Sequence, residues 1–343
     1  MPDKFLIKDI ALQAGVSVAT VDRVVNDRGG VRAHTVQRVG QALRELERQS
    51  TQIGLVGRKF IIDIVMEAPR RFTEAVRTAL ETELPNLHPA VFRSRFQSFE
   101  TASPTEVADC LGRIATRGSH GVLLKARDEP EVIAGVGRLI EAGIPVVTLV
   151  TDLPATRRRA YVGMDNRVAG ETAAYLIGEW LGRTPAEILV TLSSNRFRGE
   201  EEREIGFRRV LRNRYPLHGI VEIAEGYGVD RTTGALAQAA LAQSPDIAAV
   251  YSIGGGNRAV LAAFEAAGRT CRVFIAHDLD HDNVALLRSG GINCVLHHDL
   301  RADMRMACQH VMRAHKALPP AMMMPLSNVQ VVTPYNLPAD PVS

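Results

Sequence analysis

The sequence predicts a small all-α module followed by a larger α/β body of two lobes. Up to about residue 49, three short segments place apolar side chains at helical spacing. Beyond about residue 60, apolar strand-like runs alternate with amphipathic helical stretches in two successive series, as in parallel sheets flanked by helices. We therefore expect an N-terminal unit over residues 1–49, a linker over 50–59 and a two-lobed unit over 60–343.

The composition is that of an ordinary globular protein, with 46% hydrophobic and 23% charged residues. No apolar run approaches the roughly 20 residues of a membrane-spanning helix, and the start lacks the apolar core of a signal peptide. We expect a cytoplasmic protein that has no membrane partner. The four widely separated cysteines predict reduced packing residues, without a zinc or disulfide framework, and no cofactor is expected: Cys110, Cys271, Cys294 and Cys308.

Positive charge is concentrated near the N-terminus. The chain has 41 Lys and Arg against 38 Asp and Glu, of which residues 1–59 hold ten and six, leaving 31 and 32 for the remainder. This asymmetry favours a polyanionic partner for the N-terminal unit, although a solvated surface with a few spare arginines would look similar.

The N-terminal unit has the signals of two helices joined by a tight turn. A short helix starts at Ile7, Gly15 supplies the left-handed residue that ends it, and Ser17 is placed to cap the next helix. In the second helix, Val21, Val24 and Val25 can face inward while Val18, Ala19, Asp22 and Arg23 face outward. A third amphipathic segment, at about 33–47, is expected to close a small core with Val36, Val39, Leu43 and Leu46.

The run IKDIALQAGVSVATVDRVVN, from Ile7 to Asn26, resembles the headpiece of the lac-repressor family of transcription regulators. The resemblance implies a helix-turn-helix whose second helix enters the DNA major groove and presents Val18, Ala19 and Arg23 to base edges. An arginine can donate two hydrogen bonds to guanine, and small apolar side chains suit thymine methyl groups. The expected DNA contacts also include the helix-capping residue and the phosphate-side residues: Ser17, Thr20, Asn26 and Thr35.

Two positions depart from the family pattern. Asp22 stands where the family often has a phosphate-bonding serine, and we expect its carboxylate to orient Arg23. The family usually continues with Tyr-x-Pro-Asn and a hinge helix, whose leucine wedges into the minor groove. Residues 48–55 lack that signature, so Leu55 is the candidate wedge, although Gly54 weakens a helix there.

Eight apolar runs in the body predict parallel strands in two similar lobes. We expect strands at 61–66, 90–96, 121–126 and 145–150, and then at 188–193, 220–226, 248–254 and 272–277. The chain should cross back near residues 294–299, and the last strands should lie at 329–335. In such sheets a ligand binds at the carboxyl ends of the strands, which predicts a site in the cleft between the lobes.

The body also resembles the effector domain of the lac-repressor family, which is similar to periplasmic sugar-binding proteins. The resemblance covers residues 60–335 and is carried by YVGMDN at 161–166, EEREIGF at 201–207, IGGGNR at 253–258 and IAHD at 275–278. It implies that Arg203, Asn257 and Asp278 contact the ligand, and His298 stands where the family often has a crossover glutamine.

These residue types suit a sugar or polyol, whose hydroxyl groups need carboxylate and amide acceptors and an arginine donor. An aromatic face would cover the apolar side of the ring, and the candidates are Phe72, Phe197 and Tyr251, although any one aromatic residue is more often in the core than in a pocket. Asp152 and Asp165 are candidate ligand contacts with an equally good structural interpretation, since Asp165 could cap the following helix.

Two other functions compete with this interpretation. Clustered histidine and aspartate can bind metal, so a metal-dependent hydrolase would use His277, Asp278, His281 and His298, but no motif such as His-Glu-x-x-His accompanies them. A sugar-binding protein without DNA function is the other alternative, and the complete headpiece argues against it. The sequence thus predicts a homodimer that binds near-palindromic double-stranded operator DNA, a repressor released by a sugar or polyol, and not an enzyme.

Overall fold

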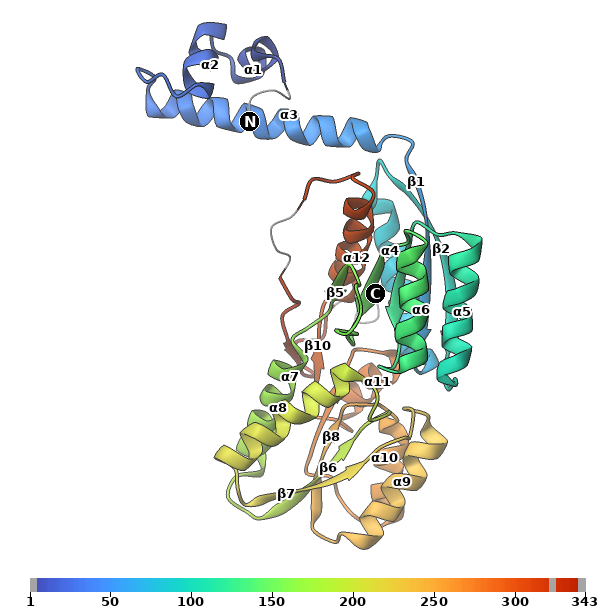
Figure 1. Ribbon diagram of the computed structural model, residues 1–343. Coiled ribbons are helices and arrows are strands. Elements are labelled where there is room, and N and C mark those ends of the chain that lie inside the picture. The colour runs from blue at the N-terminus through green and yellow to red at the C-terminus, as the bar shows by residue number, and fades with distance from the viewer. Residues whose placement is uncertain (1–4, 321–324, 339–343) are drawn as a thin grey trace.

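The computed structural model describes residues 5–320 and 325–338. The N-terminal unit contains α1 (Ile7–Ala14), α2 (Val18–Val25) and α3 (Ala33–Leu55), and it projects from one end of the two-lobed body (Figure 1). The predicted turn is confirmed. Gly15 ends α1 in the left-handed conformation with φ 61°, and the Ser17 hydroxyl accepts the Thr20 amide at 3.2 Å to cap α2.

The headpiece has its own small core. It consists of Ile10, Ala11, Ala14, Val21, Val39 and Ala42, against which Val24, Val25, Leu43 and Leu46 are partly buried. The expectation for Val36 is wrong, because this side chain lies at the start of α3, outside the cluster, and is 43% exposed. The Arg38 guanidinium donates to the Ala14 and Gly15 carbonyl oxygens at 2.7 and 3.2 Å, so α3 also caps the carboxyl end of α1.

The third helix is longer than the sequence predicts. It continues through Gly54 to Leu55, and the predicted linker over 50–59 is largely helical. Tertiary contact outweighs the low helix propensity of glycine here, since Leu55 is buried in the core of the first lobe. The prediction that Leu55 wedges into the minor groove is therefore wrong for this structure, because its side chain is buried in the first lobe and is not available to DNA.

The body contains two sheets. The first is wholly parallel with the order β2-β1-β3-β4-β5: β1 (Lys59–Glu67), β2 (Val91–Phe99), β3 (Gly121–Lys125), β4 (Val146–Leu149) and β5 (Ala160–Val162). The second has the order β11-β10-β9-β8-β6-β7: β6 (Ala186–Thr191), β7 (His218–Ile223), β8 (Ile247–Ser252), β9 (Val273–His277), β10 (Cys294–His297) and β11 (Gln330–Val332). Only β11 is antiparallel. The eight predicted strands are confirmed, and β11 lies within the predicted range 329–335, whereas β5 and β10 were not predicted as strands.

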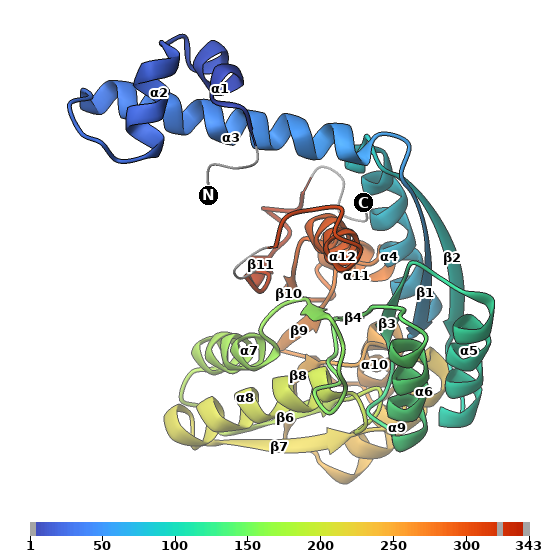
Figure 2. The same cartoon turned by 45° about the horizontal axis from the view of Figure 1, so that its top comes forward.

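Helices cover both sheets (Figure 2). The first lobe has α4 (Arg70–Glu83), the short 3-10 helix η1 (Leu84–Leu87), α5 (Pro104–Arg117), α6 (Pro130–Glu141) and α12 (Leu300–Ala314). The second has α7 (Asn166–Leu181), α8 (Arg198–Arg214), α9 (Asp230–Gln243), α10 (Asn257–Ala266) and α11 (His281–Ser289). No helix among the described residues is long and apolar enough to cross a membrane. The four cysteines are free, and three of them are buried.

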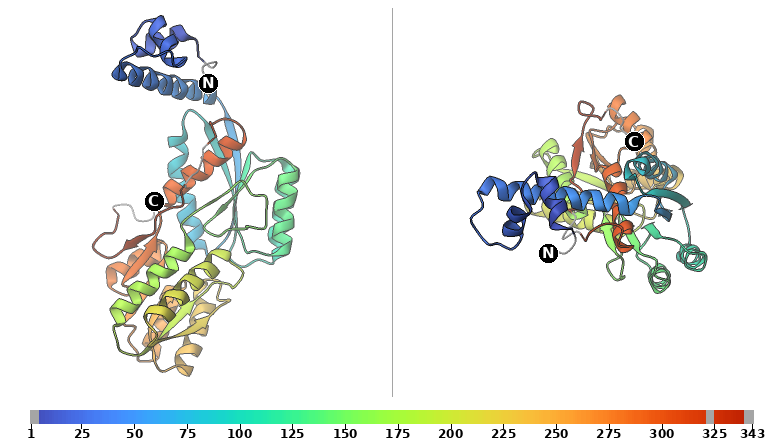
Figure 3. Two further views of the ribbon diagram at one scale, coloured as in Figure 1. Left: turned by 60° about the vertical axis from the view of Figure 1, so that its left-hand side comes forward. Right: turned by 90° about the horizontal axis from the view of Figure 1, so that it is seen from above.

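The chain passes between the lobes three times. It leaves the first lobe between β5 and α7, returns between β10 and α12, and ends in the second sheet with β11 (Figure 3). The predicted crossover near 294–299 is confirmed, because β10 belongs to the second sheet and Leu300 and Met304 of α12 pack in the first-lobe core. Three connections allow the lobes to move relative to each other without separating.

Two glycines bring α7 and α8 into backbone contact. A Cβ atom on Gly170 would lie 1.8 Å from the Arg203 carbonyl oxygen, and one on Gly206 would lie 2.2 Å from that of Arg167. The two helices lie side by side (Figures 1 and 2). Because the contact involves the backbone of Arg203 itself, it determines where the arginine side chain starts.

Gly170→Ala is expected to lower the free energy of unfolding by about 1–3 kcal/mol, because the added methyl group must force the helices apart. Gly137→Ala on α6 is the matched control, since a Cβ there meets nothing within 4 Å. The control should raise the free energy of unfolding by less than about 1 kcal/mol. Urea denaturation of both variants measures the difference, and equal stabilities would contradict the steric argument.

Candidate ligand site and DNA-binding surface

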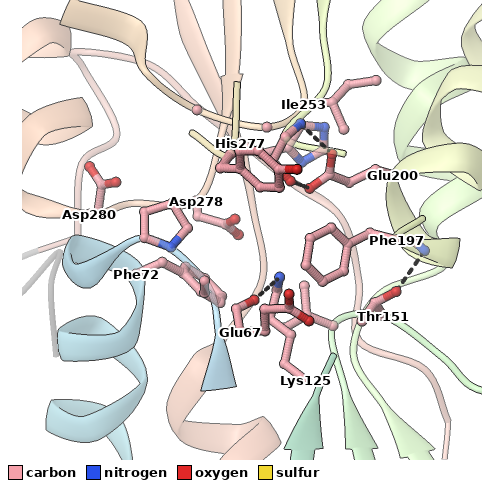
Figure 4. Close-up of a pocket in the computed structure, with 18 of the residues that line it drawn as sticks. Glu67, Phe72, Lys125, Thr151, Phe197, Glu200, Ile253, His277, Asp278 and Asp280 are labelled. Atoms are coloured by element: carbon pink, nitrogen blue, oxygen red, sulfur yellow. Dashed lines mark hydrogen bonds between the residues drawn. The ribbon is translucent and has the colours of Figure 1, made fainter. Parts of the chain in front are cut away.

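A pocket lies between the lobes at the carboxyl ends of the strands, the position that the parallel sheets predict (Figure 4). On the first-lobe side, Glu67 and Lys125 end β1 and β3, and Thr151 follows β4. On the second-lobe side, Asp278 follows β9. Both lobes therefore contribute polar groups to one cavity, so that a ligand in it would contact both.

Four of the sequence-predicted ligand residues line this pocket: Phe72, Phe197, Arg203 and Asp278. Figure 4 shows the two phenylalanine rings on either side of the cavity, with the Asp278 carboxylate between them. The Lys125 ammonium lies 3.9 Å from the centre of the Phe197 ring, a cation–π distance. The Arg203 Nη2 and Asp278 Oδ1 atoms are buried and have no hydrogen-bond partner in the protein, so they are free to bind a ligand.

Three further predicted residues stand behind the pocket and position its lining. Tyr251 is fully buried, stacks on Phe207 and bonds His277 Nε2 at 2.9 Å, because its ring completes the second-lobe core. Asn257 donates to Asn283 Oδ1 at 2.6 Å, and Asn283 in turn donates to the Asp278 carbonyl at 2.7 Å. The expectation that Tyr251 and Asn257 touch the ligand is therefore wrong.

His298 is also fully buried, and it lies behind Asp278. Its Nδ1 is 2.5 Å from Asp303 Oδ2, and its Nε2 is 3.6 Å from Asp278 Oδ1, an ion-pair distance too long for a hydrogen bond. It is not a lining residue, contrary to prediction. Burial alone lowers the pKa of His298, but the carboxylates of Asp303 and Asp278 raise it to about 9. The charged imidazole and Arg203 hold the pKa of Asp278 well below its ordinary value, although burial acts in the opposite direction.

The remaining two predicted ligand residues lie outside the pocket. Asp152 accepts the Thr148 hydroxyl and the Leu153 amide at 2.8 Å and pairs with Arg158, so it fixes the loop after β4. Asp165 accepts the Val168 amide at 3.1 Å and caps α7, which confirms the alternative interpretation. Both carboxylates satisfy nearby backbone groups and cannot reach the cavity.

Sequence reasoning missed several charged lining residues: Glu67, Arg71, Lys125, Glu200 and Asp280. A signal was available for two of them, because Glu67 directly follows the apolar run at residues 64–66 at the end of β1, and Lys125 ends the otherwise apolar β3. Such a residue lies at the carboxyl edge of a parallel sheet, where ligands bind. The other three follow strands or begin helices, and nothing local separates them from surface charges.

Arg71 bridges the two lobes. It belongs to α4 of the first lobe, and its Nε lies 2.8 Å from Asp280 Oδ2 while its Nη1 donates to the Gly228 carbonyl at 2.9 Å, both in the second lobe. The triple glycine at 254–256 makes room for this arginine and turns sharply into α10. A Cβ on Gly255 would lie 2.0 Å from Arg71 Nη2, and Gly256, the N-cap of α10, has the left-handed conformation.

Backbone strain is concentrated around the cavity. Val150, Tyr227 and Asp278 all line it, and all have left-handed φ angles, of 64°, 54° and 65°. This conformation is unfavourable for any residue with a Cβ and most of all for valine. Strain of this kind persists where surrounding contacts impose it, as at binding sites.

The described residues contain no group of three or more His, Cys, Asp or Glu side chains arranged to hold a metal ion. His281 of the suspected cluster is 85% exposed, whereas His277 and His298 are buried. Burial lowers the pKa of His277 well below its ordinary value. The metal-dependent hydrolase is therefore not supported.

The outer face of α2 is available to a partner. Val18 is 53% exposed, and Ala19 and Arg23 are also exposed, as predicted for groove contacts. The expectation that Asp22 orients Arg23 is wrong, because its carboxylate pairs with Arg28 at 2.7 Å and accepts a hydrogen bond from the Asn26 side-chain amide at 2.7 Å. Thr20 and Thr35 are half-buried, with hydroxyls near Ser17 and His34.

The body and its interlobe pocket define a two-lobed binding protein. Residues 65–315 match the sequence model of the periplasmic binding protein domain, and residues 6–48 match that of the bacterial regulatory proteins of the lacI family. The body thus belongs to the periplasmic binding protein domain family and the headpiece to the lacI family of bacterial regulatory proteins. Together they make the chain a ligand-responsive DNA-binding regulator of transcription.

Solved structures share the fold at low sequence identity. The glucose-galactose binding protein GanP from Geobacillus stearothermophilus is 21% identical over 82% of this chain and 99% of its own, with a TM-score of 0.71. A solute binding protein from Burkholderia graminis, in complex with D-arabinose, is 18% identical over 83% and 98%, with a TM-score of 0.72. A protein assigned as a LacI transcriptional regulator from Bacteroides fragilis is 14% identical over 81% and 98%, with a TM-score of 0.71. No curated protein matches the sequence.

His298→Gln should weaken the pH dependence of stability above neutrality. The pKa of His298 is raised in the folded state from 6.5 to about 9, so its stabilising contribution is complete below pH 6.5 and is lost as the pH rises through 9. We expect the stability difference between wild type and variant to shrink by roughly 1–3 kcal/mol between pH 6 and 10. Urea titrations across that range measure it. His281→Gln, at an exposed histidine, is the control. If the stability difference between wild type and His298→Gln did not change with pH, His298 would not be charged in the folded protein.

Proposed function

We propose that this protein is a homodimeric repressor that leaves a near-palindromic operator when a sugar or polyol binds between its lobes. In this proposal residues 1–49 bind DNA, residues 60–343 bind the ligand and dimerise, and residues 50–59 connect them. The observation that carries it is the pocket. Unpartnered polar atoms of Arg203 and Asp278 face a cavity bordered by Phe72 and Phe197, the combination that a polyhydroxylated ring requires.

Lobe movement would reach DNA through α3. The helix runs without interruption from the headpiece to Leu55, whose side chain is anchored in the first lobe, and β1 starts four residues later. A ligand that binds the closed cleft better than the open one would rotate the first lobe and change the spacing of the two headpieces. A coupling free energy of about 1–3 kcal/mol corresponds to a 5- to 150-fold change in operator affinity.

The test is operator binding in the presence of candidate effectors. Genomic fragments selected by the purified protein supply the operator, and fluorescence anisotropy with monosaccharides and sugar alcohols gives the ligand response. We expect a preferred site at moderate salt and weaker binding with an effector. The absence of any preferred site, with and without the sugars, would defeat the proposal.

Arg23→Ala should weaken operator binding by about 1–3 kcal/mol and relax the preference at one base pair in each half-site, because an exposed arginine on α2 can read guanine. Binding to operators with single base-pair changes measures the effect. Unrelated duplex DNA is the control for phosphate contacts. An equal loss on every sequence would mean that Arg23 contacts only the backbone.

Asp278→Ala should remove the effector response and leave operator binding intact. The carboxylate offers an unpartnered acceptor in the pocket, and a hydrogen bond to a charged group contributes about 1.5–3 kcal/mol, or roughly a 10- to 150-fold change in effector affinity. Asp282→Ala is the matched control, since Asp282 pairs with Arg258 on the surface. Calorimetric titration of both variants decides the assignment, and an unchanged effector affinity in Asp278→Ala would exclude it.

A further inference from the structure

Two cations in the pocket have no carboxylate partner. The Lys125 ammonium is buried, and its hydrogen bond goes to the Glu67 carbonyl oxygen at 3.0 Å. The buried Arg203 guanidinium donates through Nε to Asn166 Oδ1 at 2.8 Å, and its Nη2 has no hydrogen-bond partner. Within the part of the chain that the structure describes, no carboxylate oxygen lies within 4.0 Å of a nitrogen of either side chain.

The nearby carboxylates of the pocket are already engaged by other groups. Glu67 pairs with Arg127 at 2.6 Å, and Asp280 pairs with Arg71 at 2.8 Å. Glu200 accepts hydrogen bonds from Ser193, one from its backbone amide at 2.7 Å and one from its hydroxyl group. Apart from Asp278, whose Oδ1 is free, these acids have counter-ions or donors within the protein, whereas neither cation has a carboxylate oxygen of the described residues at ion-pair distance.

An unpaired buried cation is unfavourable, because it loses hydration without gaining a partner. Burial lowers the pKa of Lys125, and the negative charges of Glu200, Glu67 and Asp278 only partly oppose this effect. Arginine and lysine together suit an anion, since the planar guanidinium binds carboxylate or phosphate oxygens and the ammonium acts as a second point charge. A neutral polyol would satisfy the free hydrogen-bond donors but would leave both cations without a direct ion pair.

We infer that the effector carries an anionic group, a carboxylate or a phosphate, which lies between Lys125 and Arg203. The free Asp278 Oδ1 then accepts a hydroxyl group of the same ligand, and Phe72 and Phe197 contact the carbon skeleton. The chemical class is an acidic sugar derivative, such as an aldonate, a uronate or a sugar phosphate. This inference rests on the proposed function, because it assumes that the pocket binds the effector.

The first experiment needs no knowledge of the ligand. Lys125→Met keeps the length of the side chain and its contact with Phe197 but removes the charge. We expect the full-length variant to melt about 2–4 °C higher than wild type without ligand, because an unpaired buried charge has been removed. Lys59→Met, at the exposed first residue of β1, is the matched control and should leave the melting temperature unchanged. A lower melting temperature for Lys125→Met would overturn the inference.

The second experiment compares neutral sugars with their acids. Common hexoses and pentoses are titrated beside their aldonates, uronates and phosphates, with acetate and inorganic phosphate as bare anions, by thermal shift and operator release. We expect an acid or phosphate to bind at least 10-fold more tightly than its neutral parent, and Lys125→Met to abolish that difference while Lys59→Met preserves it. Whether carboxylates or phosphates respond identifies the anionic group.

Two outcomes separate the inference from the proposed function. If neutral sugars release the operator as well as their acids do, and Lys125→Met responds like wild type, the inference is wrong and the proposed function stands. If none of the sugars, acids or phosphates changes melting or operator binding, the proposed function fails and the inference fails with it.

Discussion

The pocket depends on the backbone contact between α7 and α8. Gly170 and Gly206 let the two helices approach until each meets the other's backbone, and Arg203 projects from that contact. Asn166, at the start of α7, then joins both lobes. It donates to the Val150 carbonyl at 3.0 Å and accepts from Arg203 Nε at 2.8 Å. The arginine is thereby held against the crossover between the lobes, and any larger residue at these glycines would displace it.

Buried charge connects the pocket to the crossover segments. Asp278 comes from the second lobe, His298 lies in the crossover after β10, and Asp303 lies on α12 of the first lobe. Ser327, in the last crossover, donates to Asp303. A group that binds Asp278 therefore acts on residues that connect both lobes. In a low-dielectric interior such interactions are strong, and a small change at the pocket can affect the relative position of the lobes.

The connection from the lobes to the headpiece is equally direct. Because α3 is continuous and Leu55 is buried in the first lobe, movement of that lobe is transmitted along a single helix. Arg38 and the small headpiece core hold α1 and α2 to the other end of the same helix. The exposed α2 surface therefore follows α3 as one body, which suits a mechanism based on headpiece spacing.

Local signals in the sequence were sufficient for the architecture. Apolar runs and helical periodicity predicted both parts of the chain, eight of the nine strands that have four or more residues, the Gly15 turn and the Ser17 cap, because these depend on interactions within a few residues. Parallel strands also determined that a site would lie at their carboxyl ends, and four of the nine predicted ligand residues line it. The extension of α3 to Leu55 could not be predicted, since long-range burial overcame a local helix breaker.

Only the tertiary structure decided which polar residues face the cavity. Tyr251 and His298 are as close in sequence to strand ends as Asp278, and Asn257 starts the helix after β8, yet all three bond other buried groups behind it. Arg203 was predicted to contact the ligand and Lys125 was not, but only their surroundings showed that no carboxylate among the described residues pairs with either of them. Sequence by itself determined the residue types, the fold and the edge of the sheet. The tertiary structure determined which charged side chains remain available to a ligand, because ion pairs form between residues that are far apart in the chain.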